Sequence, residues 1–508
     1  MRITNKIMRN NSLYNINQNK MLEDQLSNQM TNQSKIVRPS DDPVIAIRAL
    51  RLRSNVTNVS QYYEKNAPDA EQWLNVTSDA MTTVSKVLTD LYKQTTDASN
   101  KYLGSEDLSI ILEQMKSLTD EFYASGNVDY AGRYVFSGYR TDTPITYTAE
   151  QIAEMGKHPV RFRIEEGIGY DEISTISYTN YEDLTSEQTI SNHTLYRYRL
   201  SYDATEEKDP AGNPKISFEI KDKNGNAKTA PDPQQDVKEF ANAEEAYKAV
   251  ASGTWKDKDV AYIPSTGEVV FSEKYYQNNC AEGDTVKVSY YKSKWEEGDL
   301  NPVHYFKCTE TTDYNDATKA KSINYNFSQE DQDIYYDVGY NQQIQVNTKA
   351  DELFTHDARR DVEDFTHFMS QLKDVEQKIA DIEEEMSLTA EGTAAYKALE
   401  TKLEAANKAY TYVRDNLQTK FENQITKYQK YMDDSHLAIT NNATRGSRLD
   451  LISERLMNQK STFKELQSNN EDIDVTEVAV ELSSADLTYQ AALMATSKIM
   501  QTNLMNYI

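Results

Sequence analysis

The sequence predicts a mainly α-helical protein with a β-rich insertion. Its two chain ends are expected to form a long antiparallel helical bundle or coiled-coil rod, from which the β-rich part projects. Apolar residues recur in steps of three and four over residues 45–98 and again over 372–499. Over residues 139–345 the apolar period changes to two, which is typical of strands. At 508 residues, the chain has room for about two to four domains.

The N-terminal 37 residues are polar and rich in Asn and Gln. Their apolar residues have helical spacing but form a thin stripe: Leu13, Ile16, Leu22, Leu26 and Met30. A helix with so little apolar surface is marginal alone in water. We therefore expect this segment to need a partner.

A helix start is predicted at Pro39-Ser40-Asp41-Asp42-Pro43. Either Asp41 or Asp42 can accept a hydrogen bond from a free backbone N–H at the helix N-terminus. Pro43 suits the first helical position, where an N–H is not needed. With Pro39 behind it, this stretch predicts a joint between two helical segments.

The helix that follows is predicted to run to about residue 98, interrupted by a kink or break at Pro68. Its seam residues are expected to be buried; among them are Leu52, Val56, Val84 and Leu91. A second helix should start at Ser105 and stop near Gly126.

The β-rich region is marked by alternation and by turn residues. Tyr196, Tyr198, Leu200 and Tyr202 should face one way, with Arg197, Arg199 and Ser201 on the other side. Turns are predicted at Asn224-Gly225 and at 265–267. A short helix is expected near 242–251.

Helical spacing returns at about residue 356. A long antiparallel hairpin near 370–432 is predicted, with a turn at Glu391-Gly392-Thr393, followed by a further helix over 432–468. The last helix should run from about Val475 to the end. It carries the residues expected to pack in an assembly: Leu482, Tyr489, Leu493, Met500 and Leu504.

This pattern predicts three parts. The terminal coiled-coil helices would be residues 1–40 and 474–508. The helical rod would be residues 41–140 and 341–473. The β-rich outer part would be residues 141–340, as one domain or as two subdomains. A projecting insertion leaves and returns at one place. We therefore expect its ends, near Tyr139 and Asn341, to lie close together.

The net charge of −26 argues against a nucleic-acid partner, which needs basic residues to neutralise phosphates. Residues 1–40 have a net charge of +4 and residues 474–508 of −3, so the ends can attract each other. Two cysteines, Cys280 and Cys308, exclude a disulfide framework but leave their pairing open. No apolar run is long enough for a membrane span, and the start has no signal-peptide pattern. These features alone would predict a cytoplasmic protein.

No catalytic, cofactor-binding or metal-binding constellation is predicted. The six histidines include no His-Glu-x-x-His pair, and neither a phosphate-binding loop nor a nucleophile elbow is present. The Tyr-rich strands leave a second interpretation open, a protein that binds carbohydrate through ring faces. Tyr on strands is more commonly a packing residue.

Several stretches in order resemble the flagellin superfamily. They are the start Met1-Arg2-Ile3-Thr4, Pro39–Pro43, Arg133–Tyr139, Ile344–Asn347, Arg445–Leu449 and the tail from Ala491 to Leu504. Arg133–Tyr139 is similar to a strand that follows the rod helices, and Ile344–Asn347 to a return strand. Asn32-Gln33-Ser34 departs from the family's usual Ser-Gly pair before Pro39.

The resemblance implies a structural subunit of the bacterial flagellum that joins hook to filament and self-assembles as a ring through its terminal helices. Flagellin itself or another hook-associated protein is the alternative. It further implies an adjacent hook-associated protein, flagellin and an export chaperone as partners. It also replaces the cytoplasmic expectation with export to the cell exterior without a cleaved signal.

Overall fold

The computed structural model describes residues 5–206, 214–233, 235–252, 260–316, 318–326 and 332–501. The chain forms two compact units. Unit 1 comprises Met1–Glu71, Tyr336–Ile344 and Ser447–Ile508, and unit 2 comprises Gln72–Tyr335 and Gln345–Gly446. The predicted class, mainly helical with a β-rich central region, is confirmed. The division into three parts stays a prediction.

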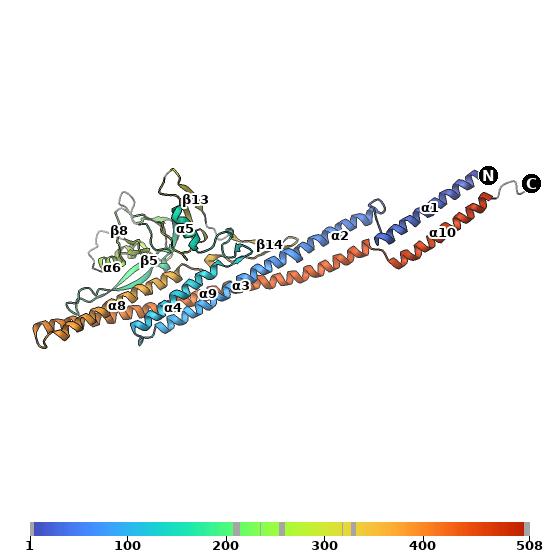
Figure 1. Ribbon diagram of the computed structural model, residues 1–508. Coiled ribbons are helices and arrows are strands. Elements are labelled where there is room, and N and C mark those ends of the chain that lie inside the picture. Colours follow the sequence, from blue (N-terminus) through green and yellow to red (C-terminus); the bar gives the residue numbers. More distant parts are fainter. Residues whose placement is uncertain are drawn as a thin grey trace, which may run out of the picture. The chain divides into compact units, whose positions relative to one another are not determined.

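Long helices dominate both halves of the chain (Figure 1). The α-helices of the described residues are α1 (Asn5–Asn32), α2 (Pro43–Gln61), α3 (Ala67–Ala98), α4 (Ser105–Ala124), α5 (Ala149–Lys157), α6 (Ala243–Ala251), α7 (Glu273–Asn279), α8 (Asp357–Leu388), α9 (Ala394–Glu471) and α10 (Val475–Gln501). A π-helical turn, η1 (Tyr62–Asn66), joins α2 to α3, and short 3₁₀ turns are η2 (Ser125–Asn127), η3 (Tyr170–Glu172), η4 (Pro302–His304) and η6 (Ala350–Glu352).

Unit 1 contains the two terminal helices. Helices α1 and α10 lie side by side (Figure 1). Leu26 packs against Val478, whereas the earlier residue Lys20 lies over the ring of the later residue Tyr489, so the two helices run antiparallel. The predicted helical pairing of the chain ends is therefore present within one chain.

The junction between α2 and α3 confirms a break near Pro68. The N–H of Ala67 donates to the carbonyl of Tyr62, five residues earlier, instead of the α-helical four. Pro68 follows directly and has no N–H to give to this turn. The helix therefore changes its hydrogen-bond pattern just before the proline.

The predicted separate helix over 432–468 is wrong, because Ala394–Glu471 is one helix of 78 residues. The stretch contains no proline, and its only glycine, Gly446, costs too little to break a helix that packs along its length. The turn before it is as predicted, with Gly392 at φ +82°, a conformation that glycine adopts readily.

The helices of unit 2 share a dense apolar core. Val84 and Leu91 of α3 are fully buried, as are Met115 of α4 and Phe365 of α8. The ring of Phe365 stacks on that of Phe421 in α9, with centroids 4.3 Å apart. Helix α4 starts at Ser105 as predicted.

The helix stop near Gly126 has a different cause from the one expected. Gly126 lies in the 3₁₀ turn η2 and has a negative φ. A Cβ atom there would be 2.1 Å from Cδ1 of Ile145 and 3.1 Å from the ring of Phe354. Glycine is needed for this close approach and not for a left-handed helix cap.

The β-rich region of unit 2 contains two sheets of five and six strands, ordered β4-β5-β10-β9-β8 and β13-β12-β3-β11-β6-β7. All of their pairings are antiparallel except β8 with β9. Their bounds are β3 (Val160–Gly169), β4 (Ser174–Thr179), β5 (Asn192–Arg199), β6 (Ile216–Lys221), β7 (Ala227–Lys228), β8 (Val237–Glu239), β9 (Val260–Ile263), β10 (Glu268–Phe271), β11 (Thr285–Lys292), β12 (Lys307–Thr312) and β13 (Lys321–Tyr325). The predicted turns join β6 to β7 and β9 to β10.

Two small hairpins stand apart from these sheets. They are β1 (Asp129–Tyr130) with β2 (Arg133–Tyr134), and β14 (Tyr335–Gly339) with β15 (Gln342–Gln345). Arg133–Tyr139 is thus a strand over only two residues, shorter than expected. Most of the β14–β15 hairpin belongs to unit 1, although the predicted outer part 141–340 included β14.

The two ends of the β-rich region of unit 2 do lie close together. The backbone N–H of Tyr139 donates to Oε1 of Gln332 over 3.1 Å. A Cβ atom on Gly138 would lie 2.6 Å from that same oxygen. Asn341, the predicted point of return, belongs to unit 1.

Candidate assembly site

The inner seam between α1 and α10 brings three predicted site residues together. Leu26 is buried against Val478 and Ala485, and Leu482 packs on this cluster. The ammonium of Lys20 lies 5.9 Å from the ring centroid of Tyr489, a cation–π distance. The α10 side of the seam follows the predicted heptad spacing.

The α1 side of the seam differs from the predicted stripe. Leu13 and Leu22 are exposed, whereas the half-buried positions between the seam's apolar residues are polar. These polar seam residues are Ser12, Asn19 and Glu23. Ile16, Leu26 and Met30 of the predicted stripe do lie on the seam, whereas Leu13 and Leu22 fall outside the helical spacing that these three residues share.

Leu493, a further predicted residue of α10, does not join this seam. Leu493 is 43% exposed. The side chain of Met500 lies outside the described residues, as does all of Leu504. Their packing in an assembly stays a prediction, and the start Met1-Arg2-Ile3-Thr4 also lies outside the described residues.

The joint between α1 and α2 uses both aspartates, in different ways. Asp42 caps α2, because its Oδ1 accepts from the N–H groups of Val44 and Ile45 over 2.8 and 3.1 Å. Asp41 instead turns back, and its Oδ2 accepts from the N–H of Arg38 over 2.8 Å. Pro43 is the first residue of α2, and it and Pro39 are exposed.

The same joint is tied to the end of α9. The backbone N–H of Lys35 donates to the carbonyl of Glu471 over 2.7 Å, and its ammonium donates to the carbonyl of Asn469 over 2.6 Å. The guanidinium of Arg53 in α2 donates to both carboxylate oxygens of Glu471, each at 3.0 Å from Nε. This hydrogen bond and ion pair raise the pKa of Arg53.

Sequence reasoning missed Glu471 as part of this joint. It is a buried carboxylate at the C-terminal end of a helix, where a negative charge is unfavourable without a partner. That position is the one signal that could have marked it. Its partner Arg53 lies 418 residues away, so local spacing could not find the pair.

Of the predicted rod residues, Val84 and Leu91 are fully buried, whereas Leu52 and Val56 are only half-buried. In that part of α2, the buried positions are instead Ala46, Ala49 and Val59. Leu52 and Val56 lie on the same face as Ala49 and Val59, at spacings of three and four, but are less completely covered.

Two of the flagellin-like stretches meet inside unit 2. The side chain of Asn347 is fully buried and donates to the carbonyl of Gln332 over 2.8 Å. Its Oδ1 accepts from the N–H of Ile334, also at 2.8 Å. The guanidinium of Arg445 in α9 donates to the carbonyl of Asn347 over 2.7 Å. These bonds tie the returning chain to α9.

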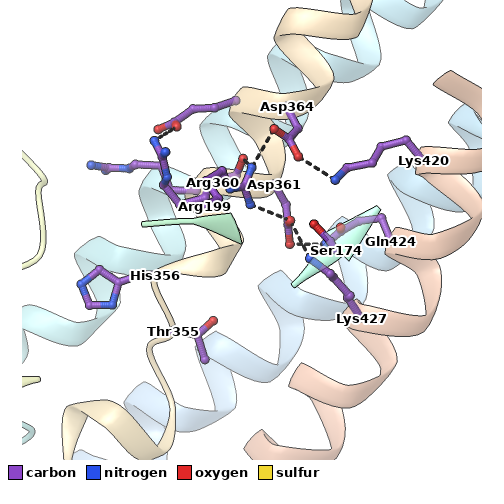
Figure 2. Close-up of polar contacts among 12 residues, drawn as sticks. Ser174, Arg199, Thr355, His356, Arg360, Asp361, Asp364, Lys420, Gln424 and Lys427 are labelled. Atoms are coloured by element: carbon purple, nitrogen blue, oxygen red, sulfur yellow. Dashed lines mark hydrogen bonds and ion pairs between the residues drawn. The ribbon is translucent and has the colours of Figure 1, made fainter. Parts of the chain in front are cut away.

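A buried ion cluster joins the five-stranded sheet to α8 and α9 (Figure 2). The carboxylate of Asp364 lies 2.7 Å from a guanidinium nitrogen of Arg197, 2.9 Å from one of Arg199 and 2.6 Å from the ammonium of Lys420. Asp361 pairs with Arg199 over 2.9 Å. The predicted alternation of β5 is right, but its arginines face this cluster and not solvent.

The electrostatics of the cluster follow from burial and close pairing. Burial alone raises the pKa of Asp364, but the guanidinium groups of Arg197 and Arg199 hold this pKa well below its usual range. Burial lowers the pKa of the Lys420 ammonium, against the opposing effect of Asp364. The charges are thus compensated, and their role is to hold the sheet on the helices.

The described residues contain no group of three or more His, Cys, Asp or Glu side chains arranged to hold a metal ion. Cys280 and Cys308 are both free and buried. The stacked rings of Tyr170, Tyr196 and Tyr276 cover one another's faces, with centroids 6.0 and 4.0 Å apart along the stack. Among these residues, no helix is long and apolar enough to cross a membrane.

Comparison with known proteins relates part of this chain to flagellar proteins. Residues 3–141 match the model of the bacterial flagellin N-terminal helical region. Flagellar hook-associated protein 3 of Escherichia coli is 29% identical over 23% of this chain and 36% of its own length. The protein of the same name from Salmonella typhimurium is 25% identical over 28% of this chain and 45% of its own length. The N-terminal region of the chain is therefore of flagellin type.

The chain spans less than half the length of these two curated relatives. Among solved structures, FlgL of Xanthomonas campestris is 11% identical, with a TM-score of 0.28 over 82% of this chain and 99% of that one. The match over residues 3–141 includes α1 to α4, and with them the α1 side of the seam.

Proposed function

We propose that this protein is a structural subunit of the bacterial flagellum that joins the hook to the filament and assembles through its terminal helices. The observation that carries the proposal is the pairing of α1 with α10 in a chain whose N-terminal region is of flagellin type. Both curated relatives are named as flagellar hook-associated protein 3. In this role the protein is not an enzyme and needs no cofactor or metal.

The proposal includes the assembly and its partners. Residues 1–40 and 474–508 would form the assembly core, as a ring of copies. An adjacent hook-associated protein would lie on the hook side and flagellin on the filament side, with an export chaperone before secretion. The protein would act outside the cell, exported without a cleaved signal.

Immuno-electron microscopy of intact flagella tests this function. Labelling confined to a ring at the end of the hook is the expected result. Labelling along the whole filament would identify a filament subunit, and labelling at another position would identify a different hook-associated protein. Absence of label from flagella would overturn the proposal.

Limited trypsin digestion tests the role of the terminal helices. In the monomer, cuts are expected at Lys20, Lys35 or Arg38 and at Lys498, while Lys86 of α3 is spared. In the assembly, the terminal sites should become protected. Equal protection of the ends and Lys86 in a demonstrated monomer would contradict the view that contacts between copies stabilise the terminal helices.

A carbohydrate-binding function of the Tyr-rich β region is the second candidate. The stacking of Tyr276 with Tyr170 and with Tyr196 disfavours it, because these rings pack against one another. A glycan array probed with the full-length protein would reveal it.

A further inference from the structure

Helices α1 and α10 each carry a second apolar stripe, on the face opposite to the inner seam. Six side chains, each between 51% and 71% exposed, repeat at seven-residue intervals: Ile7, Tyr14 and Met21 on α1, and Val480, Leu487 and Met494 on α10. Residues two positions apart on an α-helix point about 200° apart. Tyr14 therefore faces away from buried Ile16, and Leu487 faces away from buried Ala485.

The positions between these apolar residues differ between the two helices. Continuing in steps of four and three, the α1 stripe passes through three amides: Asn11, Gln18 and Gln25. The α10 stripe passes through two small residues, Ser484 and Ala491, and then reaches Lys498. Large side chains on one helix and small ones on the other suit knobs-into-holes packing. Between the apolar residues of either stripe these positions are uncharged, and Lys498 follows at the end of the α10 stripe.

The two outer stripes also lie at the same level along the helix pair. The contact of Lys20 with Tyr489 fixes the antiparallel alignment of α1 and α10. Because the helices are antiparallel, Met21 is then about level with Leu487, and Tyr14 is about level with Met494. Ile7 and Val480 extend the two stripes in opposite directions beyond this shared stretch. A neighbouring copy placed beside the pair would meet these stripes without an axial shift.

The net charges of the two helices favour contact between unlike stripes of neighbouring copies. Over Asn5–Asn32, α1 has three basic and two acidic residues, a net charge of +1, whereas α10 over Val475–Gln501 has a net charge of −2. Contact between α1 of one copy and α10 of another brings opposite charges together. Contact between two copies of the same helix brings like charges together, which is disfavoured.

We infer that the outer stripe of α1 in one copy packs against the outer stripe of α10 in the next copy. This inference rests on the proposed function and specifies how the copies would meet. The two outer stripes point away from each other, so every copy offers one surface to each of two neighbours. Such a head-to-tail contact propagates around a closed ring or along a helical array.

Cysteine cross-linking of full-length protein tests which stripes meet. Met21→Cys and Leu487→Cys proteins of distinguishable size would be mixed, assembled and oxidised. The wild type, whose two cysteines are buried, is the control. Mixed links between positions 21 and 487 are expected. Links dominated by 21–21 or 487–487 pairs, or an assembly with no links, would overturn the inferred pairing.

A charge variant tests the strength of the contact. Leu487→Glu should raise the concentration needed for assembly about tenfold or more, measured by sedimentation velocity. Thr488→Glu adds the same charge beside the stripe at another exposed position and should have little effect. Equal circular dichroism spectra would show that both variants fold, because neither residue is buried.

The outcomes separate this inference from the proposed function. Unchanged assembly of Leu487→Glu would reject the stripe contact and leave a self-assembling subunit. A wild type that stays monomeric at every concentration would reject both. Assembly that Thr488→Glu impairs as strongly as Leu487→Glu would show a general charge effect, and would also reject the stripe contact.

Discussion

Removing the carboxylate of Asp364 should destabilise unit 2 strongly. In Asp364→Ala, the cationic groups of Arg197, Arg199 and Lys420 lose a partner that lies 2.6–2.9 Å from each of them. All three groups are largely buried, so water cannot replace the carboxylate. Breaking a buried ion pair by deleting one partner costs about 3–5 kcal/mol. The free energy of unfolding should fall by that amount.

Urea denaturation followed by tryptophan fluorescence is a suitable assay, because Trp73 and Trp295 both lie in unit 2. The matched control is Glu154→Ala, which removes an exposed partner of Lys157 on the short helix α5. The control should leave the urea midpoint where it is. An unchanged midpoint for Asp364→Ala would refute the view that this cluster holds the sheet on the helices.

The same cluster predicts a pH dependence. The pKa of Asp364 is lower in the folded protein than in the unfolded chain. Its contribution to stability is therefore complete above the unfolded pKa of about 3.9 and is lost as the pH falls through the folded pKa. The difference in unfolding free energy between the wild type and Asp364→Ala should shrink in strong acid. A difference that grows on acidification would contradict this sign.

Three further substitutions test local packing. Gly126→Ala should lower the melting temperature, because its new Cβ has no space, whereas Gly156→Ala has open space and should raise it slightly. Asp42→Ala removes the cap of α2 and should lower the free energy of unfolding by about 0.5–2 kcal/mol. Amide hydrogen exchange at the start of α2 should become faster, and an unchanged exchange rate would contradict the capping role of Asp42. Val84→Asp buries an unpaired charge and should lower the melting temperature sharply. Thr82→Asp is the control, because Thr82 is exposed. Equal melting temperatures of the two variants would place the seam on another face.

Heptad spacing correctly predicted which side chains are buried wherever the seam between helices is filled by apolar residues alone. Val84 and Leu91 of α3 are buried as expected, and Ala485 occupies the predicted row of α10. On α1 the inner seam is largely polar, so its direction depends on α10 and could not be deduced from α1 alone. Asn19 is half-buried there although nothing in its own segment marks it.

The polar part of the site was beyond sequence reasoning for a different reason. Alternation placed Arg197 and Arg199 together on one face of a strand, and that pattern is typical of a solvated face. The groups that compensate their charge, Asp361 and Asp364, come more than 160 residues later in the chain. Only the folded arrangement turns an apparently exposed face into a buried one.

The π-helical turn η1 has a consequence for how the length of this chain can vary. A π turn holds one residue more than the α-helical turn it replaces. Elsewhere in a packed helix, a single-residue insertion rotates every later side chain by about 100° and turns the apolar face outward. Tyr62–Asn66 already absorbs one such residue, so a deletion here is the length change most readily accommodated, by reversion to a plain α-helix. Natural homologues that differ by one residue between α2 and α3 should therefore keep the same faces buried.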